Sequence, residues 1–328
     1  MAHLDVDVVI PLYNKGPYIA QAVRSALGQS HAPRSVIVAD DASTDGGREA
    51  VAAIAADDQR VRLLVSDAAM PRGAGSARNR AVRETVAEFV AFLDADDFWN
   101  AEKLAAQLPV MADPAIGTVH CGARVVTSDG RCVAELYPPP PPPPSQIFDE
   151  IRLGRYSVTG SSSAVLTRRS LLERAGPFSD EAAFAEDWDM WVRLAALSGF
   201  VAVPRLLTNI RALPTRWQSS SDAERFARWL GLLDRWKDDE TFMQRAEAEV
   251  RGIVARHQAG LLLHSPRRAF VDYPREVLRH GGVLGQRLFG TRSARAFTSG
   301  TMLPALALRA SQKALRSLSA RRRAARVG

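Results

Sequence analysis

The chain of 328 residues is poor in cysteine, with Cys121 and Cys132 alone. Two cysteines exclude a disulfide framework and a cysteine-rich zinc site, and they suit a reducing compartment. The sequence also lacks an apolar run of the roughly 20 residues that a membrane-spanning helix needs. Its first residues carry Asp5 and Asp7 and lead directly into an apolar run, unlike a secretory signal peptide. We therefore expect a cytoplasmic protein.

Acidic residues are absent from the stretch 277–328, which holds 11 of the 43 Lys and Arg. The other 32 basic residues stand against all 36 acidic ones, so residues 1–276 carry a net charge of −4 although the whole chain carries +7. Leucines among arginines at 305–326 can form an amphipathic helix, which would bind an anionic membrane surface and make the protein peripheral on the inner face of the plasma membrane. The alternatives are a helix packed on its own domain and a solvated end. We expect no nucleic-acid partner.

Apolar runs and helical patterns alternate through the first hundred residues. Strands rich in β-branched residues are predicted at 6–12, 36–39, 61–65 and 89–93. Helices with one apolar face are predicted between them, at 18–27, 43–56 and 75–86. This alternation is typical of a mostly parallel α/β sheet with helices on both faces, whose ligands bind beyond the carboxyl ends of the strands.

The pattern becomes mixed after the first hundred residues. Further strands are predicted at 119–127 and at 158–167, and a short helix at 168–175 that ends at Gly176. The seven prolines at 138–144 predict a stiff, extended surface connection, either a plain spacer or a ligand for a proline-binding partner. Beyond residue 219 the pattern is helical, at 223–236, 240–263, 274–279 and 305–326. We therefore expect a main α/β domain over 1–218 and a helical extension with a basic tail over 219–328.

Acidic residues follow two of the predicted strands. Asp40 and Asp41 follow the second strand, and Asp94, Asp96 and Asp97 follow the fourth. Three carboxylates after a buried strand are expected to face an opening or a cation, because like charges raise one another's pKa. Alternation along an extended chain would place Asp94 and Asp96 on the same side. A divalent metal with a phosphate beyond it stabilises such a cluster, which indicates an enzyme that handles a nucleotide diphosphate.

Two other segments offer groups for a nucleotide. After the first strand, the ring of Tyr13 could stack on a base, and Asn14 offers a donor and an acceptor. Before the helix at 75–86, Gly73 would let the backbone approach a phosphate, and Arg78 could pair with an anion. Each signal is weak alone, since turns and helix starts commonly contain such residues. Ser43 or Asp45 would in addition cap the helix at 43–56.

Three carboxylates gather within four residues at Glu186, Asp187 and Asp189, beside Trp188 and Trp191. The tryptophans are expected to face the core of a helix. Acidic residues in a first helical turn are favoured by the helix dipole, which is the structural explanation. The functional explanation is a carboxylate that acts as a general base.

Taken together, these motifs resemble those of the inverting glycosyltransferases of family 2, which have the GT-A fold. The similar stretches lie in the family's order, at 8–19, 38–45, 73–82, 92–104 and 185–195. The resemblance implies transfer of a sugar from a nucleotide-diphosphate donor to a hydroxyl of a glycan or glycolipid acceptor, in the synthesis of a cell-surface polysaccharide or glycolipid. A nucleotidyltransferase of similar fold and a non-catalytic membrane-surface scaffold are the alternatives.

The resemblance also implies a role for each site residue. Asp187 would deprotonate the acceptor hydroxyl, and Asp96 would bind Mg²⁺ or Mn²⁺. The nucleotide sugar would be bound by Pro11, Tyr13, Asn14, Asp41, Arg78, Asp94 and Glu186. Many relatives carry a histidine in a pattern like R-x-H-P, where this chain has Leu213. If that histidine assists the metal in relatives, this protein uses a water or another group instead, or is less active.

Overall fold

The computed structural model describes residues 4–67, 70–143, 145–159, 161–179, 185–213 and 230–262. The chain divides into two compact units, Met1–Pro214 and Thr215–Gly328. The boundary that we expect after residue 218 lies within 214–229, outside the described residues, and stays a prediction.

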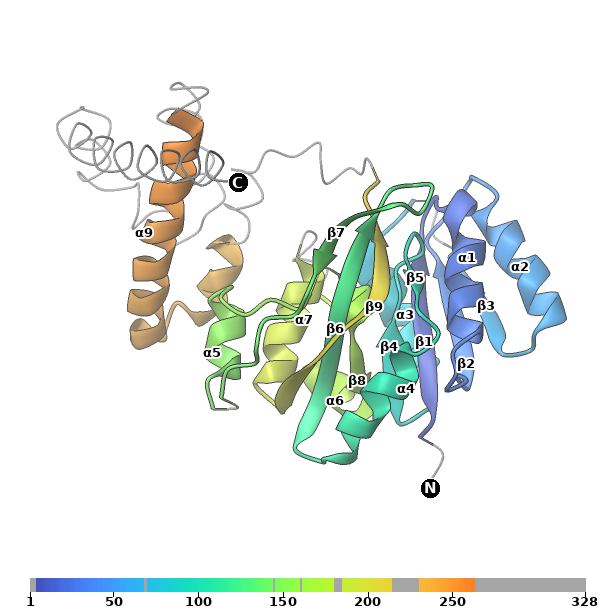
Figure 1. Cartoon of the computed structure of the whole chain (residues 1–328), viewed down its shortest axis with the longest axis horizontal. Helices are drawn as coiled ribbons and strands as arrows, with labels where there is room; N and C mark the ends of the chain where they lie inside the picture. The colour runs from blue at the N-terminus through green and yellow to red at the C-terminus, as the bar shows by residue number, and fades with distance from the viewer. Residues whose placement is uncertain are drawn as a thin grey trace, which may run out of the picture. The chain divides into compact units, whose positions relative to one another are not determined.

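The first unit is built on a nine-stranded sheet whose amino-terminal half is parallel (Figure 1). Its parallel strands lie in the order β3 (Val61–Val65), β2 (Ser35–Asp40), β1 (Val6–Leu12) and β4 (Phe89–Phe92). β1 and β4 are buried along their whole length and are almost entirely apolar, as strands covered on both faces must be. The four predicted strands agree with these within one residue at each end.

Helices cover both faces of this parallel half. They are α1 (Gly16–Leu27), α2 (Gly47–Asp57) and α3 (Ala74–Arg83). Right-handed crossovers put α1 and α2 on one face and α3, which leads back to β4, on the other. Alternate β1 residues such as Val8 and Ile10 share one core with Ile19 and Val23 of α1. Burial of that apolar face is what docks α1 against the sheet.

The second half of the sheet is mixed, as the sequence predicts. Its strands are β5 (Phe98–Trp99), β6 (Ile116–Val126), β7 (Cys132–Leu136), β8 (Leu166–Arg168) and β9 (Gly199–Arg211). β8 is antiparallel to both β4 and β6, whereas β6 and β9 run parallel. The predicted strand at 119–127 corresponds to β6.

The strand predicted at 158–167 is wrong for most of its length. Ser162–Ala164 form a 3₁₀ turn, η2, and extended pairing begins at Leu166. Ser161 accepts a hydrogen bond from the N–H of Ser163, and the hydroxyls of both serines donate to Asp97. These side-chain contacts replace a strand ladder.

The sequence did not indicate β9, because Pro204 interrupts its apolar run. In the structure Cys121 pairs with Val203 and Gly122 with Leu206, so a bulge accommodates the proline. Proline without an N–H is tolerated at such a bulge.

Short helices complete the first unit: α4 (Lys103–Gln107), η1 (Leu108–Ala112), α5 (Ile147–Arg152), α6 (Arg169–Ala175) and α7 (Glu186–Ala195). α6 ends before Gly176, which has a positive φ of 79°, as predicted. In α7 the ring of Trp191 packs against Phe92 and Phe178. Trp188, expected in the core, is half-buried and donates its indole N–H to the carbonyl of Ile151.

The second unit is described over residues 230–262, with η4 (Leu233–Trp236) and α9 (Glu240–Leu262). The Asp239 carboxylate accepts from the N–H of Phe242 and so caps α9, the helix predicted at 240–263. The helices predicted at 274–279 and 305–326 lie outside the described residues. None of the helices in the described part of the chain is long and apolar enough to cross a membrane.

Candidate active site

The predicted site residues gather where neighbouring parallel strands end. Leu12 of β1 pairs with Asp40 of β2, and Val9 pairs with Phe92 of β4, so these strands end along one edge of the sheet. Parallel strands in this register bring the loops after β1, β2 and β4 together.

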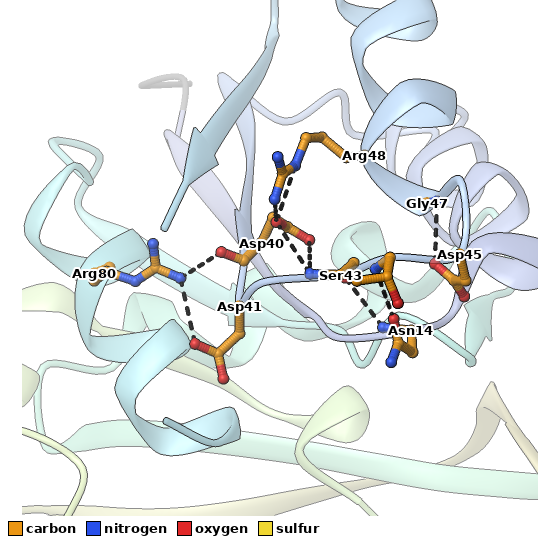
Figure 2. A network of polar contacts seen from close by, with 9 residues as sticks. Asn14, Asp40, Asp41, Ser43, Asp45, Gly47, Arg48 and Arg80 are labelled. Atoms are coloured by element: carbon orange, nitrogen blue, oxygen red, sulfur yellow. Dashed lines mark hydrogen bonds and ion pairs between the residues drawn. The ribbon is translucent and has the colours of Figure 1, made fainter. Parts of the chain in front are cut away.

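Asp41 is buried just after β2, and its two carboxylate oxygens differ in their hydrogen bonding. One oxygen accepts from the N–H groups of Arg72 and Gly73, at 2.8 and 2.7 Å. The other has no hydrogen-bond partner among the described residues, although an Arg80 nitrogen lies 3.9 Å away (Figure 2). Gly73 adopts a φ of 99°, which favours glycine. The backbone amides that we expected to meet a phosphate therefore bind the protein's own carboxylate.

Asp40 faces a different set of partners (Figure 2). Its carboxylate accepts from Arg48 at 2.7 and 3.2 Å and, more weakly, from the N–H of Ser43. Its carbonyl accepts from Arg80 at 2.7 Å. Asp40 is fully buried and satisfied, so it holds the β2 end in place and leaves Asp41 as the carboxylate with a free oxygen.

The loops after β1 and β2 are tied to each other. The N–H of Asn14 donates to the Ser43 hydroxyl, and its side-chain oxygen accepts from the N–H of Thr44 (Figure 2). Asp45 accepts from Gly16 at 2.7 Å and from the first residue of α2 at 3.1 Å, so it caps two helices at once. The expected cap by Asp45 is thus present, whereas Ser43 serves the Asn14 loop.

Two other predicted residues lie on the same loop with different exposure. Tyr13 is 45% exposed, so its side chain is accessible to a ligand. Pro11 is buried within β1, so its ring shapes the strand end.

The acidic residues after β4 form a hydrogen-bonded turn, not the extended segment that we expected. The N–H of Asp97 donates to the carbonyl of Asp94 at 3.0 Å. Asp97 also turns inward, where it accepts from Ser161, Ser163 and the N–H of Arg211. Burial, followed by the charges of Asp94 and Asp96, raises the pKa of Asp97 well above its usual range. Of the three carboxylates, two therefore remain for the surface of the site.

Asp96 is held by two cationic side chains that sequence reasoning missed. The ammonium of Lys15 lies 2.6 Å from its carboxylate, and the guanidinium of Arg211 donates to its carbonyl at 2.6 Å. Arg211 is itself fixed between the rings of Tyr18 and Phe98, 4.9 and 4.8 Å from their centroids. Lys15 could have been found from its place just after β1, at the same edge as the acids. Arg211 is the arginine of the stretch that resembles R-x-H-P, but the sequence gave it no role, because it lies at the end of an unpredicted strand.

Arg78 joins the acidic turn to α7. Its guanidinium donates to Asp94 at 2.7 Å and to Glu186 at 2.9 Å, and the side chain is 4% exposed. Gly75 allows this contact, because a Cβ there would lie 3.3 Å from the Glu186 side chain. Burial lowers the pKa of Arg78, but its attraction to Asp94, Glu186 and Asp187 outweighs this and keeps the pKa above the usual value. Arg78 therefore binds two internal carboxylates, where we expected an external anion.

Asp187 is half-buried in the first turn of α7 and accepts from the N–H of Trp188 at 2.7 Å. Its pKa is raised to about 6, chiefly by burial and then by the charge of Glu186. Arg78 opposes the rise, and Asp94 adds to it. A carboxylate with this pKa is mostly ionised at neutral pH and is a stronger base than an exposed one.

The described residues do not form a complete metal cage. Among them, no three His, Cys, Asp or Glu side chains are grouped to hold a metal ion, and Leu213 offers no ligand. Asp96 does suit a hard divalent cation, since it already binds the cationic nitrogen of Lys15 at 2.6 Å. Mg²⁺ is commonly held by one or two carboxylates with phosphate oxygens supplying the rest. The residues present fit a metal that is shared with a phosphate ligand.

Sequence comparison then decides the family. The profile of glycosyl transferase family 2 matches residues 7–175, just over half of the chain. This chain belongs to glycosyl transferase family 2. It is 36% identical over 125 residues to the putative teichuronic acid biosynthesis glycosyltransferase TuaG of Bacillus subtilis, a match that covers 38% of this chain and 49% of that protein. It is 29% identical over 189 residues to the UDP-Glc:alpha-D-GlcNAc-diphosphoundecaprenol beta-1,3-glucosyltransferase WfgD of Escherichia coli, covering 58% and 69%.

Solved structures share the fold of this family 2 chain. TarS 1-349 of S. aureus in complex with UDP-GlcNAc superposes with a TM-score of 0.56 at 19% identity, over 83% of this chain and 81% of the 1-349 chain. The mannosyltransferase PcManGT of Pyrobaculum calidifontis, in complex with GDP-Man and Mn²⁺, gives 0.53 at 23% identity, over 94% and 79%. The predicted GT-A fold is confirmed.

Proposed function

We propose that the chain is an inverting glycosyltransferase that moves a sugar from a nucleotide-diphosphate donor to an acceptor hydroxyl. One observation carries the proposal: Arg78 binds Asp94 and Glu186 at once, so the acids beyond β4 and the α7 turn with Asp187 belong to a single charged cluster. Relatives named for teichuronic acid and succinoglycan biosynthesis, and a glucosyltransferase named for a GlcNAc-diphosphoundecaprenol acceptor, support a glycan or glycolipid acceptor in cell-surface polysaccharide synthesis.

The nucleotide would bind between the loops after β1 and β2. The exposed ring of Tyr13 would stack on the base. The free oxygen of Asp41 would accept from a base N–H or a ribose hydroxyl, which would satisfy a buried polar atom. Asn14 and Pro11 would act by shaping this loop.

Asp187 would act as the general base. It would take the proton of the acceptor hydroxyl as the oxygen attacks the anomeric carbon opposite the leaving diphosphate, which inverts that carbon. Such a base typically contributes about 10²–10⁴-fold to the rate. Arg78 would hold Asp94 near the ribose and Glu186 beside the general base Asp187, and so would position both carboxylates.

Mg²⁺ or Mn²⁺, when bound, would neutralise charge that develops on the departing diphosphate. Asp96 would hold the ion together with phosphate oxygens. The solved PcManGT complex contains Mn²⁺ with GDP-Man, which supports a divalent ion in this fold.

The basic segment 277–328 lies outside the described residues. We propose that it binds anionic lipid and places the enzyme peripherally on the inner face of the plasma membrane, near a lipid-linked acceptor. Its 11 basic residues and lack of acids support this.

The test uses the purified full-length chain with UDP-Glc, UDP-GlcNAc and GDP-Man, with and without Mn²⁺. One donor should bind and be slowly hydrolysed, and transfer to a lipid-linked or soluble glycan should give an inverted anomeric centre by NMR. Asp187→Asn should bind the donor without transfer, and Asp96→Asn should lose the Mn²⁺ dependence. Folded protein that binds none of the donors would contradict the proposal.

Two other outcomes identify the alternatives. Activity that survives Asp187→Asn but not Asp96→Asn would indicate a nucleotidyltransferase, which has no use for that base. Donor binding without turnover across a full acceptor panel would indicate a scaffold.

A further inference from the structure

We propose that Lys15 is a built-in counter-cation that occupies the Asp96 carboxylate until the donor arrives, so that a divalent ion binds together with the diphosphate and not before it. The proposal rests on the proposed function and adds an order of binding to it. The Lys15 ammonium lies 2.6 Å from the Asp96 carboxylate. The two side chains are 27% and 19% exposed, so ligands can reach the pair from solvent.

The backbone turn that carries Asp96 does not depend on Lys15 for its position. The backbone of its turn is fixed by Arg211, which donates to the Asp96 carbonyl at 2.6 Å. It is fixed also by the Ser163 hydroxyl, which accepts from the N–H of Asp94 at 2.9 Å. When the ammonium leaves, the turn therefore keeps its place and still offers the Asp96 carboxylate to a cation.

Lys15 can exchange partners by moving its side chain alone. Its carbonyl accepts from the N–H groups of Tyr18 and Ile19, both at 2.9 Å, and anchors the start of α1. The next residue, Gly16, donates to Asp45 at 2.7 Å and has no room for a Cβ, which would lie 2.5 Å from a backbone oxygen. The backbone is thus locked, while the flexible four-carbon stem of lysine can redirect a compact charge.

The energetics favour joint binding. A metal ion alone would have to displace the ammonium from Asp96 and leave it without a partner, while facing its like charge. A diphosphate supplies that partner and also supplies oxygens to the metal. The described residues offer fewer than three grouped protein ligands, which weakens the metal-only complex further.

The experiment measures Mn²⁺ binding to the full-length protein without nucleotide, from the EPR signal of free Mn²⁺. Lys15→Met should bind Mn²⁺ roughly tenfold more tightly than the wild type, the size expected for losing one competing charge pair. Lys15→Arg, which keeps the charge, should resemble the wild type. The double variant Lys15→Met with Asp96→Asn should lose the gained site. With saturating Mn²⁺, Lys15→Met should bind UDP or GDP more weakly.

A purely structural role for Lys15 would weaken binding of both metal and nucleotide, and that result overturns the proposal. Equal Mn²⁺ affinity of wild type and Lys15→Met overturns it too. If Asp96→Asn still abolishes Mn²⁺-dependent binding of UDP or GDP in those cases, the proposed function stands and the Lys15 proposal alone fails. If folded wild type binds neither nucleotide with Mn²⁺, the proposed function itself fails.

Discussion

Replacing Asp187 by asparagine should make the protein more stable while removing transfer. The pKa of Asp187 is raised from 3.8 to about 6 in the fold, so ionisation opposes folding. The unfolded chain gives up this proton first. Stability contributed by the neutral carboxyl is therefore lost as pH rises from 3.8 towards 6, and the full penalty remains above 6. Asparagine cannot ionise and keeps an oxygen for the Trp188 N–H, so the variant escapes the penalty.

The size of the expected stability gain follows from the shift in the pKa of Asp187. At about 1.4 kcal/mol for each pH unit, a pKa moved from 3.8 to about 6 corresponds to roughly 3 kcal/mol at pH 7.5. Roughly half of this remains at pH 5, and almost none below 3.8. The activity of the wild type should fall as the pH drops through about 6, because protonated Asp187 cannot accept the acceptor's proton.

Urea unfolding of both proteins at pH 7.5 and pH 5, with transfer rates at the same pH values, checks the prediction. Asp189→Asn on the same helix is the matched control. Asp189 is buried and binds Arg193 at 2.8 Å, so its loss should destabilise by about 1–3 kcal/mol. The reasoning would be refuted if Asp187→Asn were less stable than the wild type at pH 7.5. It would also be refuted if the stability difference between the two proteins were the same at pH 7.5 and pH 5. Full transfer by that variant would refute the role of the base.

Three further changes probe other parts of the chain. Asp41→Asn should weaken binding of UDP or GDP at least tenfold by calorimetry, because its free oxygen is assigned to the nucleotide; unchanged affinity contradicts that. Asp7 lies at the amino end of β1, where its carboxylate accepts from Ser35 and two backbone N–H groups, and it is replaced by asparagine in the second variant. Asp7→Asn should cost about 1–3 kcal/mol of stability and leave the kcat of the folded protein unchanged, and a large fall in kcat would contradict a purely structural role for Asp7. Truncation before Thr301 should reduce sedimentation with anionic liposomes, and equal binding removes the membrane proposal.

The sequence predicts the parallel half of the sheet well, because strands covered on both faces must be continuous apolar runs. β9 escaped prediction since its bulge at Pro204 depends on pairing with β6, far away in the chain. The serines near 161–163 read as strand residues until their contact with Asp97 is known. The acidic site residues could be predicted, because clustered carboxylates directly after an apolar strand are rare. The pairing of Lys15 with Asp96 was not predicted, since the two residues are 81 positions apart and only the place of Lys15 just after β1 pointed to it.

Internal cationic partners divide the acidic residues into two groups. Lys15 offsets the charge of Asp96, and Arg78 offsets the charges of Asp94 and Glu186. Asp41 instead keeps an oxygen with no hydrogen-bond partner among the described residues, and Asp187 keeps a raised pKa in spite of Arg78. A fold tolerates a carboxylate oxygen without a hydrogen bond, or a carboxylate with a raised pKa, at a cost in stability, and it does so chiefly at functional sites. We therefore propose that Asp41 recognises the nucleotide base and Asp187 abstracts the proton, while Asp96 awaits a cation and Asp94 and Glu186 stay with Arg78.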